Sequence, residues 1–257
     1  MRFSRVLMLV LVALLTVLVA SVALADGEGT DQPVKEKKVA VEKTKAEMTE
    51  KEVKTEEAKP VMATLTYIPD GGGKGGKSTK EVPYLPEGRK IATMKTTKGI
   101  VKLELWDDKA PNTVVNFVSL ANGGRYDGVE FHRVIDGFMV QTGDVQHKKG
   151  TGGPGYSIPA EFDAKLKHER GVLSMARASD PDSGGSQFFI MLAAASHLDG
   201  QYAAFGKVIE GMDIIDAIQK GDGANGSFVK AEEDKIVKLT VEGVPVEKAP
   251  APSAPEK

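Results

Sequence analysis

The residue types that could do chemistry lie between residues 131 and 205, where large apolar side chains are mixed with a few polar ones. Phe131, Phe188 and Phe205 are expected to pack in a core, because aromatic residues at strand spacing are usually buried. Neighbours in a strand point to opposite faces of a sheet, so Phe189 must face away from Phe188. One residue of this pair could therefore line an apolar pocket.

A second candidate is the run GGGKGGKS at residues 71–78, which satisfies the phosphate-binding pattern G-x-x-x-x-G-K-[ST]. That chemistry needs a helix that starts at the Lys-Ser pair, so that backbone N–H groups face the phosphates. Pro83 and Pro86 follow too closely for such a helix. We therefore interpret the run as a flexible glycine linker and expect no nucleotide.

The composition narrows the chemistry further. The 257 residues include no cysteine, which excludes disulfides and thiolate catalysis within the chain. Neither His132 nor His197 has a partner at metal-ligand spacing, so we expect no metal, and nothing indicates another cofactor. The formal net charge of −2 provides no basic footprint for nucleic acid.

Short strands separated by turns are expected over residues 89–245, which we predict to form the folded domain. Alternating polar and apolar residues predict a hairpin over 91–106. Helical spacing predicts one helix from Pro111 to just before Gly123 and a second, short helix over 212–219. Many short strands with two separated helices favour an all-β barrel or sandwich.

The N-terminus has the order of a secretory signal peptide. Arg2 and Arg5 precede an apolar run that ends in Ala-Leu-Ala at Ala25, which predicts a signal over residues 1–25. Cleavage there would give a soluble periplasmic or secreted protein. The alternative is a retained membrane anchor, since about 20 apolar residues can span a bilayer.

Two further segments are predicted to lie outside the folded domain. Residues 26–88 are interpreted as a flexible tether, first rich in Lys and Glu and then in Gly. Residues 61–68 have strand-like character, but the glycines and prolines that follow favour loops. Residues 246–257 form a tail rich in Pro and Ala.

Five sequence blocks carry a family resemblance. They are FHRVIDGFMVQTGD (131–144), GTGGPGY (150–156), GVLSMAR (171–177), GSQFFI (185–190) and LDGQYAAFGKV (198–208). In this order and spacing they resemble the signature blocks of cyclophilins, a family of peptidyl-prolyl cis/trans isomerases, and the resemblance covers about residues 90–242. It implies a mainly β fold, a closed eight-stranded antiparallel β-barrel capped by two α-helices, with the site on an outer face.

The resemblance also implies roles for the matching positions. Arg133 would be catalytic, with Gln141 beside it on the substrate backbone. A guanidinium can donate to the prolyl nitrogen, whose lone pair becomes available only as the amide twists, so this interaction is stronger in the transition state. The implied substrate-binding residues are Phe138, Met139, Ala176, Arg177, Gln187, Phe189, His197, Leu198 and Tyr202. Of these, the proline pocket would consist of Phe138, Met139, Phe189 and Leu198.

Three positions in this set depart from common family members. Arg177 stands where an Asn is common, but the contact that the resemblance implies there is largely from the main chain. His197 stands where many eukaryotic members have Trp, and Tyr202 replaces a frequent His. A ring is kept at Tyr202, so catalysis should survive. Because the Trp is associated with cyclosporin affinity, we expect weak cyclosporin inhibition and a bacterial-like member of the family.

The function expected from this resemblance is isomerisation of X-Pro bonds in unfolded or extended polypeptides, which would assist the folding of exported proteins. The alternative is a proline-peptide binding module or holdase with incidental catalysis, for which an apolar pocket alone would suffice. The expected partners are proline-containing polypeptides. We expect a monomer, in contact with a membrane only if residues 1–25 are retained.

Overall fold

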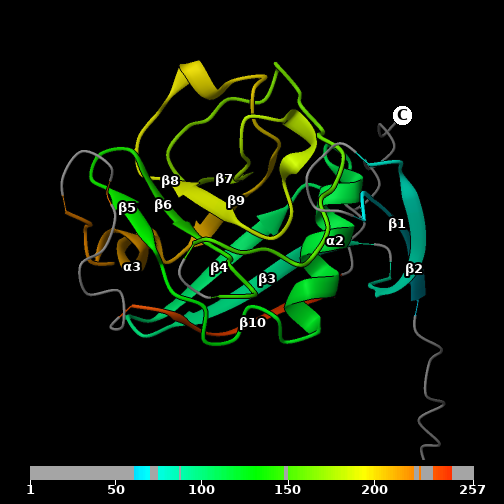
Figure 1. The fold of residues 1–257 in the computed structure, drawn as a ribbon. Helices are drawn as coiled ribbons and strands as arrows, with labels where there is room; N and C mark the ends of the chain where they lie inside the picture. The colour runs from blue at the N-terminus through cyan, green and yellow to red at the C-terminus, as the bar shows by residue number, and fades with distance from the viewer. Residues whose placement is uncertain are drawn as a thin grey trace, which may run out of the picture. The chain divides into compact units, whose positions relative to one another are not determined.

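A computed structural model describes residues 61–69, 75–86, 88–147, 150–222, 226 and 234–244. The described chain is mainly β (Figure 1). Its main sheet is built from eight strands: β3 (Arg89–Thr96), β4 (Ile100–Leu105), β5 (Arg133–Ile135), β6 (Met139–Thr142), β7 (Val172–Met175), β8 (Phe188–Met191), β9 (Ala204–Glu210) and β10 (Ile236–Val244). The hairpin predicted over 91–106 is confirmed as β3 and β4, which pair antiparallel.

The sheet is antiparallel throughout and follows the order β10-β3-β4-β9-β7-β8-β6-β5. It curls into a half-barrel, which differs from the closed barrel that the resemblance implied. Among the described residues no ladder joins the edge strands β5 and β10. The chain just before β5 instead meets the start of β10 through an isolated bridge between Glu130 and Lys235 and through backbone hydrogen bonds such as that from the N–H of Gly128 to the carbonyl of Ile236 (2.7 Å). The physical reason is that β5 is three residues long, so the chain meets β10 before β5 begins.

Both predicted helices are present. α2 (Pro111–Asn122) begins at its proline and ends before Gly123, as predicted, and α3 (Met212–Asp216) is a single short turn of helix. The N-terminus of α2 lacks a capping side chain of its own. Glu161 supplies one from a distant loop, because its carboxylate accepts the N–H groups of Asn112 (3.0 Å) and Thr113 (2.7 Å). A negative charge at a helix N-terminus also interacts favourably with the helix dipole.

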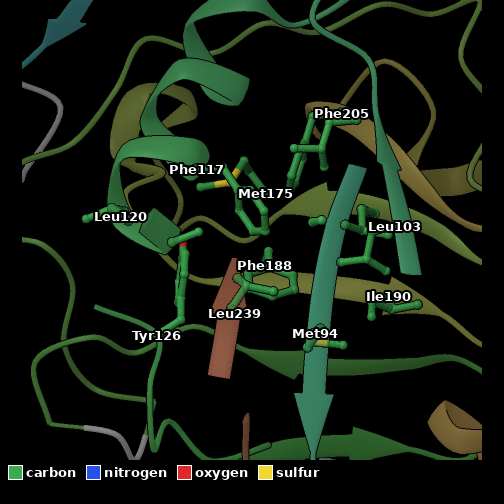
Figure 2. Close-up of a cluster of buried hydrophobic side chains, with 14 of the residues drawn as sticks. Met94, Leu103, Phe117, Leu120, Tyr126, Met175, Phe188, Ile190, Phe205 and Leu239 are labelled. Carbon is green, nitrogen blue, oxygen red and sulfur yellow. The ribbon is translucent and has the colours of Figure 1, made fainter. Parts of the chain in front are cut away.

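The main hydrophobic core lies between the inner face of the sheet and α2. Figure 2 shows Phe117 of α2 beside Phe188, Phe205 and Tyr126. The ring centroid of Phe117 lies 5.3 Å from that of Phe188, 5.2 Å from that of Phe205 and 5.3 Å from that of Tyr126. Phe131, Phe188 and Phe205 are all buried, which confirms their predicted place in the core.

In the part of the predicted tether 26–88 that the structure describes, residues 61–69, 75–86 and 88, two strands are present where the sequence favoured a flexible linker. β1 (Val61–Tyr67) and β2 (Ser78–Tyr84) pair antiparallel as a separate two-stranded hairpin beside α2 (Figure 1). Leu65 is fully buried and Val82 is nearly so, and both belong to the main core. An isolated hairpin is marginal in water, so packing on the rest of the domain stabilises strands whose glycine and proline content favoured loops.

The phosphate-binding pattern has no helix at its end. Ser78, its last residue, begins strand β2. The backbone N–H groups of a helix N-terminus, on which phosphate binding would depend, are therefore not provided at this position.

The remaining predictions about the ends of the chain concern residues outside the described ones. They are the signal peptide at 1–25, the charged part of the tether up to residue 60, and the tail at 246–257. None of the described helices combines the length and apolar character that a membrane crossing requires.

Candidate active site

Strand register places the predicted catalytic pair in one row on the outer face of the sheet. Arg133 of β5 pairs with Gln141 of β6, and Gln141 pairs with Phe189 of β8. Side chains alternate along a strand, so these three residues share a face while Val140 and Phe188 point into the core. The predicted opposite orientation of Phe188 and Phe189 is thus confirmed, since the two belong to different apolar clusters.

This row borders a groove of about 440 Å³. Ten of the eleven predicted site residues line it, and Gln201 is an additional lining residue. The predicted residues in the groove are Arg133, Phe138, Met139, Gln141, Ala176, Arg177, Phe189, His197, Leu198 and Tyr202. Gln201 lies next to Tyr202 in the fifth sequence block, so its position in that block was the signal that could have identified it.

The floor of the groove is apolar and aromatic. Met139, Phe189 and Leu198 are buried in a second cluster on the outer face of the sheet. The Phe138 and His197 rings stack with centroids 5.8 Å apart and an interplanar angle of 25°. Apolar surface flanked by rings is suited to a compact apolar ring such as that of proline.

Arg177 lines the groove and packs its side chain against Tyr202. Its guanidinium lies 4.6 Å from the Tyr202 ring centroid, and its Nε donates to the carbonyl of Gln201 (3.1 Å). The sequence resemblance implies contacts largely from the main chain of this residue. The structure adds a cation–π contact that holds Tyr202 against Phe189, whose ring centroid is 5.6 Å away.

A chain of side-chain hydrogen bonds runs from Arg133 away from the groove. Arg133 Nη1 donates to Gln141 Oε1 (3.3 Å), and Gln141 Nε2 donates to Gln187 Oε1 (3.0 Å). Gln187 Nε2 in turn donates to the carbonyls of Gly150 (3.1 Å) and Gly152 (2.8 Å). The orientation of the guanidinium is therefore linked to the glycine-rich loop through two amide side chains.

Gln187, the eleventh predicted residue, lines a second pocket of about 540 Å³ rather than the groove itself. Gln141, Ala176 and Arg177 line both cavities, so the two are contiguous. Residues 150–156 form one wall of the second pocket. An extended chain bound in the groove can continue into this pocket.

Asp144 organises the loop that carries this wall. Its buried carboxylate accepts five backbone N–H groups, those of Gln146, His147, Gly150, Thr151 and Gly152. Burial alone would raise the pKa of Asp144, but the N–H donors outweigh it and lower the pKa to about 2. The group is therefore ionised at neutral pH and stabilises the loop.

Two histidines lie close to the site without facing the groove. His168 is buried behind Phe189, with Nδ1 3.2 Å from Asp199 Oδ1 and Nε2 3.0 Å from Ser174 Oγ. Burial lowers the pKa of His168, although Asp199 opposes the shift, and burial likewise lowers the pKa of His132. Over the part of the chain that the structure describes, no three His, Cys, Asp or Glu residues gather as metal ligands would.

Comparisons with known proteins agree with this fold. The family profile described as "Cyclophilin type peptidyl-prolyl cis-trans isomerase/CLD" matches residues 91–241. A "Probable peptidyl-prolyl cis-trans isomerase" of Brucella suis is 46% identical over 160 residues, which are 58% of this chain and 81% of the relative. "Peptidyl-prolyl cis-trans isomerase B" of Bacillus subtilis is 49% identical over 123 residues, 48% of this chain and 85% of the relative.

Solved structures of cyclophilin-type isomerases have a similar fold. A cyclophilin-type isomerase of Cryptosporidium parvum superposes with a TM-score of 0.55 and 30% identity, over 61% of this chain and 99% of that one. A second structure of it, in the presence of the dipeptide Ala-Pro, has a TM-score of 0.55 and 32% identity, over 60% and 99% of the two chains. The chain therefore belongs to the cyclophilin-type peptidyl-prolyl cis-trans isomerase family, and the resemblance found in the sequence is confirmed.

Proposed function

We propose that this protein catalyses cis/trans isomerisation of X-Pro bonds in extended or unfolded polypeptides. The observation that carries the proposal is the row of Arg133 and Gln141 beside the apolar floor of the groove. Proline-containing peptides are the substrates that this groove supports. The Cryptosporidium relative, whose structure was determined with Ala-Pro present, agrees with this substrate class.

The proposed mechanism needs no covalent step. The barrier to isomerisation is about 18–20 kcal/mol because amide resonance must be broken. With the proline ring on the floor formed by Met139, Phe189 and Leu198, the Arg133 guanidinium would donate to the prolyl nitrogen as the amide twists. That donation is stronger in the transition state than in either ground state, so it lowers the barrier.

Gln141 has two parts in this mechanism. Its carbonyl accepts from Arg133, which restricts the guanidinium to orientations that face the groove. Its contact with the substrate backbone would fix one flank of the X-Pro bond, so that the other flank rotates. The second pocket offers room for the rest of an extended chain.

The test is a proline-isomerisation assay on a short X-Pro peptide with Arg133→Ala. By analogy with the removal of one transition-state donor, we expect kcat/KM to fall by about 10²–10³-fold. Arg89→Ala is the matched control, because Arg89 is an exposed arginine on β3 that pairs with Glu104. An Arg133→Ala protein as active as wild type would overturn the mechanism.

The binding-only alternative is less well supported, because a holdase would need the apolar floor but not the guanidinium beside it. Measurable peptide binding without any acceleration of exchange would reverse that judgement. The proposed mode of action is assistance to protein folding, in which X-Pro isomerisation is a slow step.

We also propose that the protein is exported, on the basis of the N-terminal pattern alone. Removal of residues 1–25 would leave a soluble periplasmic or secreted monomer, whereas retention would tether it to a membrane. N-terminal sequencing of the exported protein distinguishes these outcomes, and light scattering measures its oligomeric state. Weak cyclosporin inhibition stays a prediction, to be checked by titration in the isomerase assay.

A further inference from the structure

The hairpin of β1 and β2 touches one wall of the second pocket, and we propose that it positions this wall and thereby sets KM for peptides long enough to enter the pocket. The family profile begins at residue 91, so the hairpin lies outside it. The wall, in contrast, is residues 150–156 within it. The inference rests on the proposed isomerase function and assigns the hairpin a part in it.

Backbone hydrogen bonds join the hairpin directly to the wall. The N–H of Ile68, next to the end of β1, donates to the carbonyl of Ser157 (2.7 Å). The N–H of Ser157 donates back to the carbonyl of Ile68 (3.0 Å). Ser157 follows the wall immediately, so this reciprocal pair fixes the point where the wall ends. Ile68 and Ser157 are each only 1% exposed, which protects both bonds from water.

Side chains of the hairpin also hold the last residue of the wall. The Tyr67 ring meets the Tyr156 ring edge to face, with centroids 5.5 Å apart and an interplanar angle of 67°. Lys80 Nζ from β2 lies 4.3 Å from the Tyr156 centroid and 4.9 Å from the Tyr67 centroid. One cation therefore contacts both rings, and each strand of the hairpin contributes one group.

Tyr156 then links this wall to a neighbouring lining segment of the pocket. Its hydroxyl donates to Asn116 Oδ1 on α2 (2.7 Å), and burial raises the pKa of Tyr156 to about 12, so the proton stays on at neutral pH. Asn116 Nδ2 donates to the carbonyl of Gly185, which also lines the pocket (2.7 Å). A side chain at Gly185 would start 2.8 Å from Pro154 Cδ, so Gly185 packs directly against the wall.

The same helix anchors the hairpin. The side-chain amide of Asn112 accepts from the N–H of Thr66 (2.8 Å) and donates to its carbonyl (3.0 Å). The hairpin, α2 and the wall are thus joined pairwise: Asn112 joins the first two, Asn116 joins α2 to the wall, and Ser157 joins the wall to the hairpin. Such a closed set of contacts restricts the wall more than any one of them.

The wall needs this support because of its sequence. Four of the seven residues in GTGGPGY are glycine. Asp144 holds the first three residues of the wall, but its hydrogen bonds do not reach the last four. Glycine loses the most conformational freedom when it is ordered, so ordering this second part only when a peptide binds would weaken binding. A hairpin that holds the wall in place removes part of that cost. The effect should fall on KM, since the hairpin contacts the wall at Tyr156 and Ser157, whereas the hydrogen bonds that lead through Gln187 to Arg133 start from Gly150 and Gly152.

The experiment compares two peptides and two hairpin variants. One peptide is a blocked X-Pro dipeptide that fills only the groove, and the other is extended by several residues on both sides. In Tyr67→Leu and Lys80→Met we expect KM for the long peptide to rise roughly two- to fivefold, the range for loss of one cation–π contact, with kcat unchanged. The short peptide should show no change in either constant.

Conservative and control variants separate positioning from stability. Tyr67→Phe and Lys80→Arg keep the ring and the cation, so both should restore the wild-type KM. Thr64→Val removes the hydrogen bond from Thr64 Oγ1 to Glu81 Oε1 (2.6 Å) on the exposed side of the same hairpin and should leave KM unchanged. Slower hydrogen exchange of the Ser157 amide in wild type than in Tyr67→Leu is the matching structural readout.

Three outcomes would overturn the inference: an unchanged KM for the long peptide in Tyr67→Leu, an equal loss with both peptides, or failure of Tyr67→Phe to restore KM. If wild type accelerates neither peptide, the proposed isomerase function fails instead. The inference is then tested by binding alone. The ratio of the Kd for the long peptide to that for the short peptide is measured in wild type and in Tyr67→Leu, and an equal ratio in the two proteins would contradict the inference.

Discussion

The two halves of the sheet use their outer faces differently. In β3 and β4 buried residues alternate with exposed or partly exposed ones, so the outer face is wet and carries Lys102 and Glu104. In β7 and β8 every residue is buried, on both faces. The outer face of the second half, which includes Phe189 and Met191, forms the apolar cluster beneath the groove.

This difference shows how an antiparallel sheet with a filled interior can still bind a ligand. A half-barrel packed inside with Phe188, Ile190 and Leu103 has no room for a peptide there. Binding therefore needs apolar surface on the outside, and only one half of the sheet provides it. The charged half has the same backbone geometry but no comparable apolar cluster among its described residues.

The largest expected effect separates the two faces of β8. Phe188→Ala should cost about 3–5 kcal/mol of unfolding free energy, because Phe188 is fully buried among the aromatic residues of the core. Phe189→Ala removes a ring of the same size from the groove. Phe189→Ala should cost less unfolding free energy than Phe188→Ala. It should nevertheless lower kcat/KM, because the remaining folded protein lacks part of the groove floor. Both variants are measured by denaturant unfolding and by the isomerase assay. Equal losses of unfolding free energy and of kcat/KM in the two variants would contradict the comparison.

A smaller effect concerns the buried charge of Asp144, which holds one wall of the second pocket. The pKa of Asp144 is lowered to about 2 in the folded state from an ordinary value of 3.8. Its ionised form therefore adds stability that is fully present above pH 4 and is lost as the pH falls from about 4 to about 2. Asp144→Asn should cost about 2 kcal/mol at neutral pH and flatten the pH dependence of unfolding in that window.

The control for this variant is Asp108→Asn, since Asp108 is an exposed carboxylate that pairs with Lys109 on the surface. Its unfolding free energy should follow the wild-type curve at every pH. If the unfolding free energy of Asp144→Asn also follows the wild-type curve at every pH, the Asp144 carboxylate does not stabilise the loop.

The smallest effect is expected on the wet half of the sheet. Lys102 on β4 forms an ion pair with Glu210 of β9 at 2.8 Å, and both side chains are exposed. Lys102→Ala should change the unfolding free energy by no more than about 0.5 kcal/mol and leave the isomerase rate as it is. A loss of activity in this variant would mean that the charged half contributes to the site after all.

Local pattern was enough to predict several elements. Proline at position 111 and glycine at 123 mark the two ends of α2, as predicted. The alternation of polar and apolar residues predicts β3 and β4. The alternation of side chains along a strand places Phe188 and Phe189 on opposite faces. Each of these features is decided within a few residues by backbone geometry. The grouping of the groove residues came from the family resemblance, because no periodicity relates Arg133 to Tyr202.

Features that depend on tertiary contact could not be predicted in this way. The sequence of residues 61–88 favours a linker, because the glycines between β1 and β2 and the nearby prolines outweigh a short strand pattern. They are stabilised by burial of Leu65 and by the amide of Asn112, which the local sequence does not reveal. The open edge between β5 and β10 likewise depends on how long each strand stays paired.

The pairing of β5 with β6 has a consequence for the order in which the groove assembles. Arg133 and Gln141 are separated by only eight positions in the chain, so closing their hairpin costs little loop entropy. Phe189 and Leu198 come from much later segments, and their arrival requires long-range closure of the sheet. The polar edge of the groove is thus encoded by a contact of low sequence separation, whereas its apolar floor forms only when the long-range topology is complete.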